Sequence, residues 1–185
     1  MMQKLNLQLA EEQNTHSFYL LMDEISLATV KSAVEWIFEC NFAEERPTML
    51  NLIINSPGGD LNAAFALIDV MKGSAIPIRT IGLGQIASAG LMIFIAGEKG
   101  HRILTPNTSI LSHQYSWGAF GKEHELFATV KEFDLTTKKI ISLYKKSTGL
   151  DEKTIREVLL PPQDIWLSPQ EAKKHSLCDE IKDLS

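Results

Sequence analysis

The sequence predicts an α/β fold in which helices pack on a largely parallel sheet. Short apolar runs of strand length alternate along the chain with longer segments whose apolar residues recur at helical spacing. Glycine, proline and asparagine residues mark turns between many of these segments. Strands that alternate with helices favour parallel pairing, because each helix can cross over from one strand to the next. With 185 residues and no internal repeat or linker, the chain is expected to form one domain.

The first half of the chain is predicted to contain three strands, over residues 17–22, 49–54 and 76–83. Ser26 is placed to cap a helix that runs to about residue 40. Asp60 is placed to cap a second helix that runs to Lys72, with Gly73 in the stop position. A third helix, over residues 87–96, is almost entirely apolar or small and is therefore expected to be buried.

The second half is predicted to begin with two short strands, over residues 101–104 and 109–113. A long helix follows over residues 123–146, with basic residues in its last turn and Gly149 after it. Its apolar stripe comprises Leu126, Val130, Phe133, Ile140 and Tyr144. Two short helices, over residues 151–160 and 169–175, complete the chain, and Ser168 with Glu171 can form a capping box for the second.

Composition excludes several classes of protein. The net charge of −5 argues against a general nucleic-acid binder, which would carry a basic surface. No apolar run approaches the roughly 20 residues needed to span a bilayer, so no membrane association is expected. The polar N-terminus does not resemble a secretory signal, and Cys40 and Cys178 lie far apart without metal-type spacing. A cytoplasmic protein without a metal site is the expectation.

Ser88 is the first candidate for chemistry. It lies between small residues, just after a predicted strand and inside the first turn of a predicted helix. Small neighbours allow a substrate carbonyl to approach, and a helix N-terminus favours developing negative charge. A serine in a seam of small packing residues would have the same surroundings. Ala87 directly precedes it, so the segment is not the Gly-x-Ser-x-Gly elbow of other hydrolases.

His113 and Asp164 could complete a triad with Ser88. His113 ends an apolar strand, where the sites of open α/β sheets form, although a structural histidine would fit there as well. Asp164 directly precedes residues 165–167, an apolar segment that is expected to be buried. A carboxylate that enters the core needs a partner, and an imidazole is a suitable one. The alternative for Asp164 is an exposed loop position.

Gly58 and Gly59 follow a predicted strand and can be read in two ways. They can be a simple turn, for which glycine is the usual residue. They can also present a backbone N–H to a tetrahedral oxyanion, with the N–H of Ala89 as the second donor.

Four motifs, in this order and at similar separations, resemble those of the ClpP family, the proteolytic subunit of ATP-dependent caseinolytic proteases. The resemblance extends from about Phe18 to Ile181. The motifs are Asn-Ser-Pro-Gly-Gly at residues 55–59, Gly-Gln-Ile-Ala-Ser-Ala-Gly at 84–90, His-Gln at 113–114, and Asp-Ile-Trp-Leu-Ser at 164–168 with Glu171-Ala172.

The resemblance implies a serine endopeptidase of the ClpP/crotonase-type fold, a repeated ββα superhelix with a protruding handle helix over residues 123–146. Ser88 would be the nucleophile, His113 the general base and acid, and Asp164 the orienting carboxylate. Gly59 and Ala89 would supply the oxyanion N–H groups. Substrate would contact Gly58 and a strand over residues 116–121, of which Ser116, Trp117, Gly118, Ala119 and Phe120 are the candidates.

The resemblance also implies an assembly. Residues 1–16 would be a mobile N-terminal axial segment, and residues 17–185 a single protease domain. The subunits would form heptameric rings stacked as a tetradecamer around a chamber that degrades unfolded polypeptides. The partner would be an AAA+ unfoldase, which uses ATP, and the proteolytic subunit itself would need no cofactor.

The sequence differs from the family pattern around the triad. Tyr115 stands where the family usually has proline, Trp117 and Phe120 stand in a stretch that is usually rich in glycine, and Gln163 stands where arginine is common. Two other functions remain open. One is a ring subunit that modulates a host ClpP by mixed assembly. The other is an acyl-CoA enzyme of the crotonase type, which shares the fold.

Overall fold

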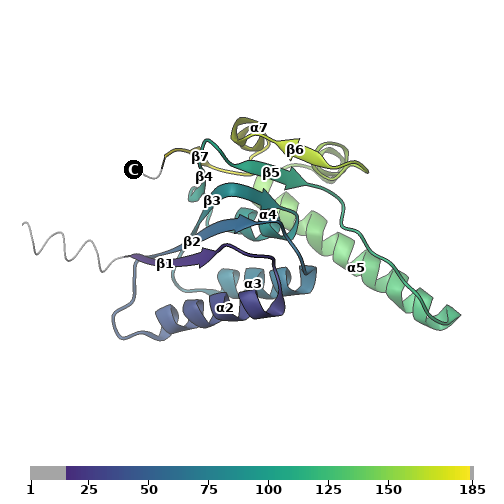
Figure 1. Cartoon of the computed structure of the whole chain (residues 1–185), viewed down its shortest axis with the longest axis horizontal. Helices are drawn as coiled ribbons and strands as arrows, with labels where there is room; N and C mark the ends of the chain where they lie inside the picture. Colours follow the sequence, from purple (N-terminus) through teal and green to yellow (C-terminus); the bar gives the residue numbers. More distant parts are fainter. Residues whose placement is uncertain (1–15, 184–185) are drawn as a thin grey trace, which may run out of the picture.

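The computed structural model describes residues 16–183, and within them the chain forms a seven-stranded sheet surrounded by helices (Figure 1). Strands β1, β2, β3, β4 and β7 lie in that order, and β5 pairs with β3 on one side and with β6 on the other. The strands are β1 (His16–Leu21), β2 (Met49–Ser56), β3 (Ile78–Ala87), β4 (Arg102–Leu104), β5 (Ser109–Ser112), β6 (Ile165–Leu167) and β7 (Glu180–Ile181).

Strand pairing is parallel everywhere among these strands except between β5 and β6. The predicted α/β class, with a largely parallel sheet and a long helix, is therefore confirmed. Strand β3 is the centre of the sheet because it pairs with β4 through Thr80–Gly82 and with β5 through Gln85–Ala87. Gly84 lies between these two stretches with a φ of 56°, a conformation that glycine adopts easily.

Helices α2 (Leu27–Phe42) and α3 (Leu61–Gly73) lie side by side below the sheet in Figure 1. Ser26 caps α2 in a capping box with Thr29, and the Asp60 side chain accepts from the Ala63 N–H at the start of α3, so both predicted caps are confirmed. Helix α4 (Ala89–Ile95) is buried along its whole length, as its apolar sequence predicts.

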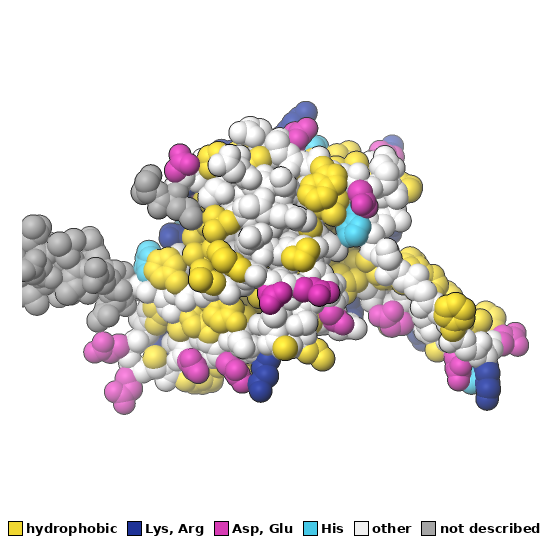
Figure 2. Space-filling view, in the orientation of Figure 1, with side chains coloured by type: hydrophobic (Ala, Val, Ile, Leu, Met, Phe, Trp, Pro, Cys, Tyr) yellow, Lys and Arg dark blue, Asp and Glu magenta, His cyan; other side chains and the backbone are white. Residues whose placement is uncertain are grey.

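Helix α5 (Glu123–Thr148), called the handle below, projects from the rest of the fold (Figure 1). Its buried residues lie only in its second half, and its first half exposes a row of apolar side chains that Figure 2 shows on the projecting arm. These exposed residues are Leu126, Phe127, Val130 and Leu135. Gly149 ends the helix with a left-handed φ of 76°, as the sequence predicts.

The remaining helices are α6 (Glu152–Thr154), the π-helix η1 (Ile155–Leu159) and α7 (Pro169–Lys174). The single helix predicted over residues 151–160 is therefore wrong, since a π-turn replaces its second part. Ser168 and Glu171 form the predicted capping box of α7.

Two predicted boundaries are also wrong. Strand β3 continues to Ala87 because its end pairs with β5, so Ala87 lies in the strand and not in the following helix. Gly73 is the last residue of α3, and the stop falls one position later, where the Ser74 N–H donates to the Met71 carbonyl. The expected axial segment over residues 1–16 lies outside the described residues apart from His16, which begins β1.

Candidate functional site

Ser88 lies at the junction between β3 and α4 in an unusual backbone conformation. Its φ is 54° and its ψ is −121°, which only a strained L-residue adopts, and the cost of such strain is about 1–3 kcal/mol. It is the N-cap residue of α4, one position before the first turn in which it was expected. Its N–H donates to the Leu111 carbonyl at 3.0 Å, so the strained junction is fixed to strand β5.

His113 and Asp164 are brought together by the antiparallel ladder between β5 and β6. The last pair of that ladder is Ser112 with Ile165; His113 directly follows β5, and Asp164 directly precedes β6. The Nδ1 atom of His113 lies 3.3 Å from the Oδ1 atom of Asp164. This contact suits a neutral imidazole whose Nδ1–H donates to the carboxylate, which leaves Nε2 as the free acceptor.

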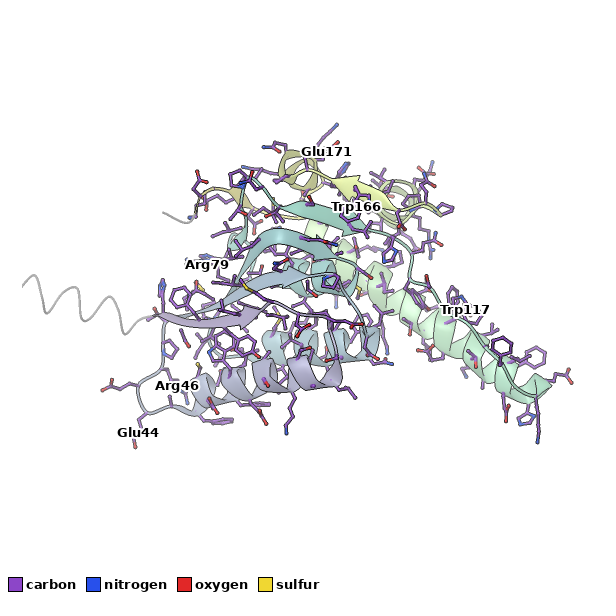
Figure 3. The ribbon with its side chains drawn as sticks, viewed as in Figure 1. Glu44, Arg46, Arg79, Trp117, Trp166 and Glu171 are labelled. Atoms are coloured by element: carbon purple, nitrogen blue, oxygen red, sulfur yellow. The ribbon has the colours of Figure 1, made fainter. Side chains whose placement is uncertain are left out.

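The expectation that Asp164 enters the core is wrong. Its side chain is 62% exposed, whereas that of His113 is 23% exposed. Strand β6 lies at the edge of the sheet, and its central residue, Trp166, is half exposed on the outside (Figure 3). Alternate side chains of an edge strand face the solvent, so an apolar segment of three residues does not bury the residue before it.

Ser88 and His113 line one cavity of about 10 Å³ with apolar residues and two tyrosines. The Nε2 atom of His113 is buried, and within residues 16–183 it has no hydrogen-bond partner. It is the ring nitrogen opposite the one that faces Asp164. His113 therefore shares a cavity with Ser88, faces the Asp164 carboxylate through one ring nitrogen, and leaves the other ring nitrogen unpaired within the described residues.

The predicted glycine turn lies directly against Ser88. Gly58 has a φ of 98°, and a Cβ atom there would lie 2.7 Å from the Ser88 Cβ and 3.2 Å from the Ala89 nitrogen. The turn is held in place because the Ile25 N–H donates to the Gly58 carbonyl at 2.7 Å. Glycine is needed at this position, because any side chain would collide with the serine.

The backbone N–H groups at this turn differ in their availability. The N–H of Gly58 donates to the Ser56 hydroxyl at 3.2 Å and is therefore occupied. In the described part of the chain, the N–H groups of Gly59 and Ala89 have no backbone acceptor. That of Ala89 belongs to the first turn of α4, where helical N–H groups have no partner within the helix. Ala89 directly follows Ser88 in the chain, and Gly59 directly follows Gly58, which packs against Ser88.

Residues 113–122 form no strand in the described structure, contrary to the expectation for residues 116–121. They lie along the handle instead, as Figure 3 shows for Trp117. The rings of Tyr115 and Trp117 both pack on Phe133, with centroids 5.3 and 4.8 Å away. The Tyr115 hydroxyl donates to the Phe133 carbonyl at 3.1 Å. The backbone N–H and C=O groups inside a helix bond to each other, so the segment cannot pair with the handle as a strand would. Side chains make the contact between the segment and the handle instead.

A larger pocket of about 190 Å³ opens beside His113, between this segment, the handle and η1. Its walls are mostly apolar or aromatic, with Arg156 at one side. Of the expected substrate-contact residues, only Trp117 lines it. Phe120 is fully exposed, Ser116 and Gly118 are exposed, and Ala119 is partly buried.

Sequence reasoning missed a polar pair beside His113. Ser112 and Tyr144 are fully buried and hydrogen bonded to each other at 3.0 Å. The sequence pattern predicts Tyr144 only as a member of the apolar stripe of the long helix. A tyrosine at the buried end of that stripe is a signal in itself, because a buried phenol needs a polar partner.

Within residues 16–183, no group of three or more His, Cys, Asp or Glu side chains is arranged to hold a metal ion. In the same range, none of the helices combines the length and the apolar character needed to cross a bilayer.

Comparison with known proteins finds relatives of this chain. Residues 13–184 match the model of a family described as Clp protease. Over 135 residues the chain is 35% identical to the ATP-dependent Clp protease proteolytic subunit of Deinococcus radiodurans. That alignment covers 72% of this chain and 65% of the relative, so the chain spans slightly less than two thirds of the length of that protein.

Proposed function

The chain belongs to the Clp protease family, and on that premise we propose that it is a serine endopeptidase subunit in which Ser88, His113 and Asp164 act as a triad. The observation that carries the proposal is the position of His113. One ring nitrogen faces the Asp164 carboxylate at 3.3 Å, the other has no hydrogen-bond partner in the described chain, and His113 lines one cavity together with Ser88. A histidine held in this way can accept a proton from the serine.

The chemistry is acyl transfer in two steps. The Ser88 Oγ attacks the substrate carbonyl carbon while its proton moves to Nε2 of His113. The Asp164 carboxylate keeps the ring in the required tautomer and stabilises the imidazolium that forms. The imidazolium then gives its proton to the leaving amine, and an ester to Ser88 remains. Water, deprotonated by the same nitrogen, attacks this ester and releases the acid product. Activity should fall on acidification, because a protonated His113 cannot act as the base.

The oxyanion that forms on the substrate needs hydrogen-bond donors that are fixed before the reaction. Gly59 and Ala89 are the proposed donors, because neither N–H has a backbone acceptor in the described chain, Ala89 follows Ser88, and Gly59 follows the glycine that packs against Ser88. Gly58 supports this site in a different way. Its lack of a side chain leaves the room that Ser88 occupies, and its own N–H is bound to Ser56.

Peptide binding is proposed along residues 116–120, whose backbone pairs with no other strand in the described chain. An extended substrate can add to such a segment through backbone hydrogen bonds, while side chains such as Trp117 and Phe120 select among substrates. The pocket of about 190 Å³ beside His113 is the proposed space for an apolar substrate side chain.

The proposed assembly is the one that the family resemblance implies, a pair of heptameric rings that enclose a chamber. The handle supports this proposal because its projecting half exposes an apolar row, which a monomer in water would not keep uncovered. The proposed partner, which the family resemblance implies, is an AAA+ unfoldase that consumes ATP; the name of the Deinococcus relative describes that protease as ATP-dependent. The subunit is proposed to act in the cytoplasm without a cofactor of its own.

Hydrolysis by the purified protein tests the proposal. A fluorogenic peptide and an unfolded protein serve as substrates, with Ser88→Ala as the test variant and Ser109→Ala, an exposed serine on β5, as its control. Parent and control should hydrolyse the peptide at similar rates, and Ser88→Ala should lose at least about 10³-fold. Equal rates in all three would contradict the proposal. A parent that is inactive alone but changes the rate of a host ClpP in mixed rings would support the modulating function instead.

A further inference from the structure

Ser112 and Tyr144 form a buried polar pair next to His113, and the mechanism above uses neither of them. Ser112 ends strand β5 and directly precedes His113, and its side chain has no contact with solvent. Tyr144 comes from the buried end of the handle and lines the cavity that Ser88 and His113 share. Hydroxyl groups are costly to bury without partners, so a pair at this place calls for an explanation.

The direction of the hydrogen bonds follows from the protons available. The Ser112 Oγ lies 2.5 Å from the Leu159 carbonyl oxygen and 3.0 Å from the Tyr144 hydroxyl. A carbonyl oxygen only accepts, so Ser112 donates to Leu159 and accepts from Tyr144. Burial raises the pKa of Tyr144 to about 12, against a smaller lowering by the hydrogen bond with Ser112. The phenol therefore keeps its proton at any pH at which a peptidase would work.

A second side chain makes an equivalent connection on the other side of the histidine. The Gln114 Nε2 donates to the Leu160 carbonyl at 2.9 Å. The residues directly before and after His113 thus bind two successive carbonyl oxygens at the end of η1. From there the chain passes through two prolines, whose rings fix the backbone, and reaches Asp164 four residues later. The segment that carries the histidine is therefore tied to the segment that carries the carboxylate.

Backbone pairing alone would not connect the segment that carries His113 to the segment that carries Asp164. The β5–β6 ladder ends at the Ser112–Ile165 pair, so the two candidates lie just beyond its last pair. The side-chain bonds of Ser112 extend the connection past that end, and Tyr144 links it to the handle.

We propose that Ser112 and Tyr144 are positioning residues that hold His113 in line with both Asp164 and the cavity at Ser88. This inference rests on the proposed function. A displacement of the ring by about 1 Å is enough to lower catalysis by about 100-fold, so the pair should affect the rate of the chemical step far more than the binding of peptide.

Three variants test the proposal: Ser112→Ala, Tyr144→Phe and the double variant. Ser112→Ala leaves the Leu159 carbonyl and the Tyr144 hydroxyl without a partner, and it can therefore also destabilise the fold. The double variant removes the unpaired phenol and should recover part of that stability. Ser112→Thr keeps a hydroxyl and serves as the rescue. Tyr19→Phe, on strand β1, is the matched control for the loss of a tyrosine hydroxyl.

The measurements are kcat and KM for a short fluorogenic peptide and the rate at which a fluorophosphonate labels Ser88. Ser112→Ala should lower kcat and the labelling rate by about 10- to 100-fold with KM within about twofold, and Ser112→Thr should restore most of the rate. Tyr144→Phe should lose less, about 3- to 10-fold, because Ser112 keeps its bond to Leu159. The double variant should remain slow although it is more stable than Ser112→Ala. Recovery of rate together with stability would overturn the positioning role.

The inference and the proposed function can fail separately. A parent that is labelled, with Ser112→Ala labelled equally fast, contradicts only the positioning role. A parent that is not labelled contradicts the proposed function. The positioning role is then decided by the crystal structure of Ser112→Ala, in which the distance between His113 Nδ1 and Asp164 Oδ1 should exceed 4 Å, beyond the 3.3 Å of the parent. An unchanged distance would overturn it.

Discussion

His113 and Asp164 face each other one residue beyond the last pair of the β5–β6 ladder, with Nδ1 of the histidine 3.3 Å from Oδ1 of the aspartate. Strand register therefore sets which residues meet, because a slip by one residue would turn each side chain to the opposite face of the sheet. The contact is a consequence of sheet topology and not of two loops that happen to approach each other.

Replacement of Asp164 by Asn should lower kcat by about 10²- to 10³-fold with little change in KM. The amide cannot stabilise the imidazolium and does not hold the required tautomer. The loss should be smaller than for a buried carboxylate, because water around this exposed side chain weakens its field. Steady-state kinetics on a fluorogenic peptide measure this, with Asp183→Asn, an exposed aspartate near the end of β7, as the control. A change of less than threefold would remove Asp164 from the triad.

Gly58→Ala should abolish peptidase activity and lower stability. The new methyl carbon would lie 2.7 Å from the Ser88 Cβ and 2.8 Å from the Ala87 carbonyl oxygen, in a backbone conformation that alanine avoids. Gly73→Ala is the matched control, because a Cβ at the end of α3 meets no atom within 4 Å. Its stability should be unchanged or higher by up to about 1 kcal/mol. Thermal unfolding and peptide hydrolysis are measured for both, and an active Gly58→Ala would contradict the packing described for Ser88.

Trp117→Ala should raise KM for peptides of eight or more residues by about 5- to 10-fold and leave the labelling of Ser88 by a small fluorophosphonate within about twofold. The indole packs on Phe133 at 4.8 Å, and this contact orders the segment on which substrate is proposed to bind. Phe42→Ala, an exposed aromatic at the end of α2, is the control for the loss of a surface ring. Slower labelling together with weaker peptide binding would indicate a role at the triad itself.

Asp179→Asn should destabilise the protein and make its free energy of unfolding depend less on pH in the acid range. The carboxylate binds the buried Arg102 through two hydrogen bonds of 2.9 and 2.6 Å. Burial raises the pKa of Asp179, but the hydrogen bonds from Arg102 and from backbone N–H groups outweigh it, and the pKa is lower than usual. The ion pair of Asp179 with Arg102 therefore stabilises the fold fully above the aspartate pKa of about 3.9 in the unfolded chain. This stabilisation is lost as the pH falls through the lower pKa that Asp179 has in the folded protein.

Denaturant unfolding at pH 7 should show a loss of about 3–5 kcal/mol for Asp179→Asn, since Arg102 would remain buried without a counter-charge. The difference between parent and variant should shrink as the pH falls below about 4. Glu180→Gln, in which only an exposed ion pair with Lys182 is lost, should change stability by less than about 1 kcal/mol. A difference between parent and Asp179→Asn that stays constant down to pH 2 would contradict the assigned cause.

Local signals in the sequence predict much of the fold. The caps at Ser26, Asp60 and Ser168 depend on hydrogen bonds within a few residues, and all three are confirmed. The end of the handle at Gly149 is also a local matter of backbone conformation. Boundaries that depend on distant partners could not be predicted in this way. Strand β3 runs on to Ala87 only because β5 lies beside it.

In the candidate site, too, some features follow from the local sequence and others depend on distant partners. The order of the motifs indicates which serine, histidine and aspartate belong together, but not how they are held. The exposure of Asp164 follows from the edge position of β6, which is a property of the sheet. The link from Ser112 to Leu159 joins residues 47 positions apart in the chain and leaves no local pattern.

Covalent labelling with mapping of the modified peptide is the most direct test of the Ser88–His113–Asp164 triad. The parent is treated with a fluorophosphonate, digested and examined by mass spectrometry, beside Ser88→Ala and His113→Ala. The triad predicts one adduct per chain, on Ser88, with no adduct in Ser88→Ala and labelling at least about 10³-fold slower in His113→Ala. Labelling of the parent at another serine, or equal labelling of Ser88 in the presence and absence of His113, would contradict the triad.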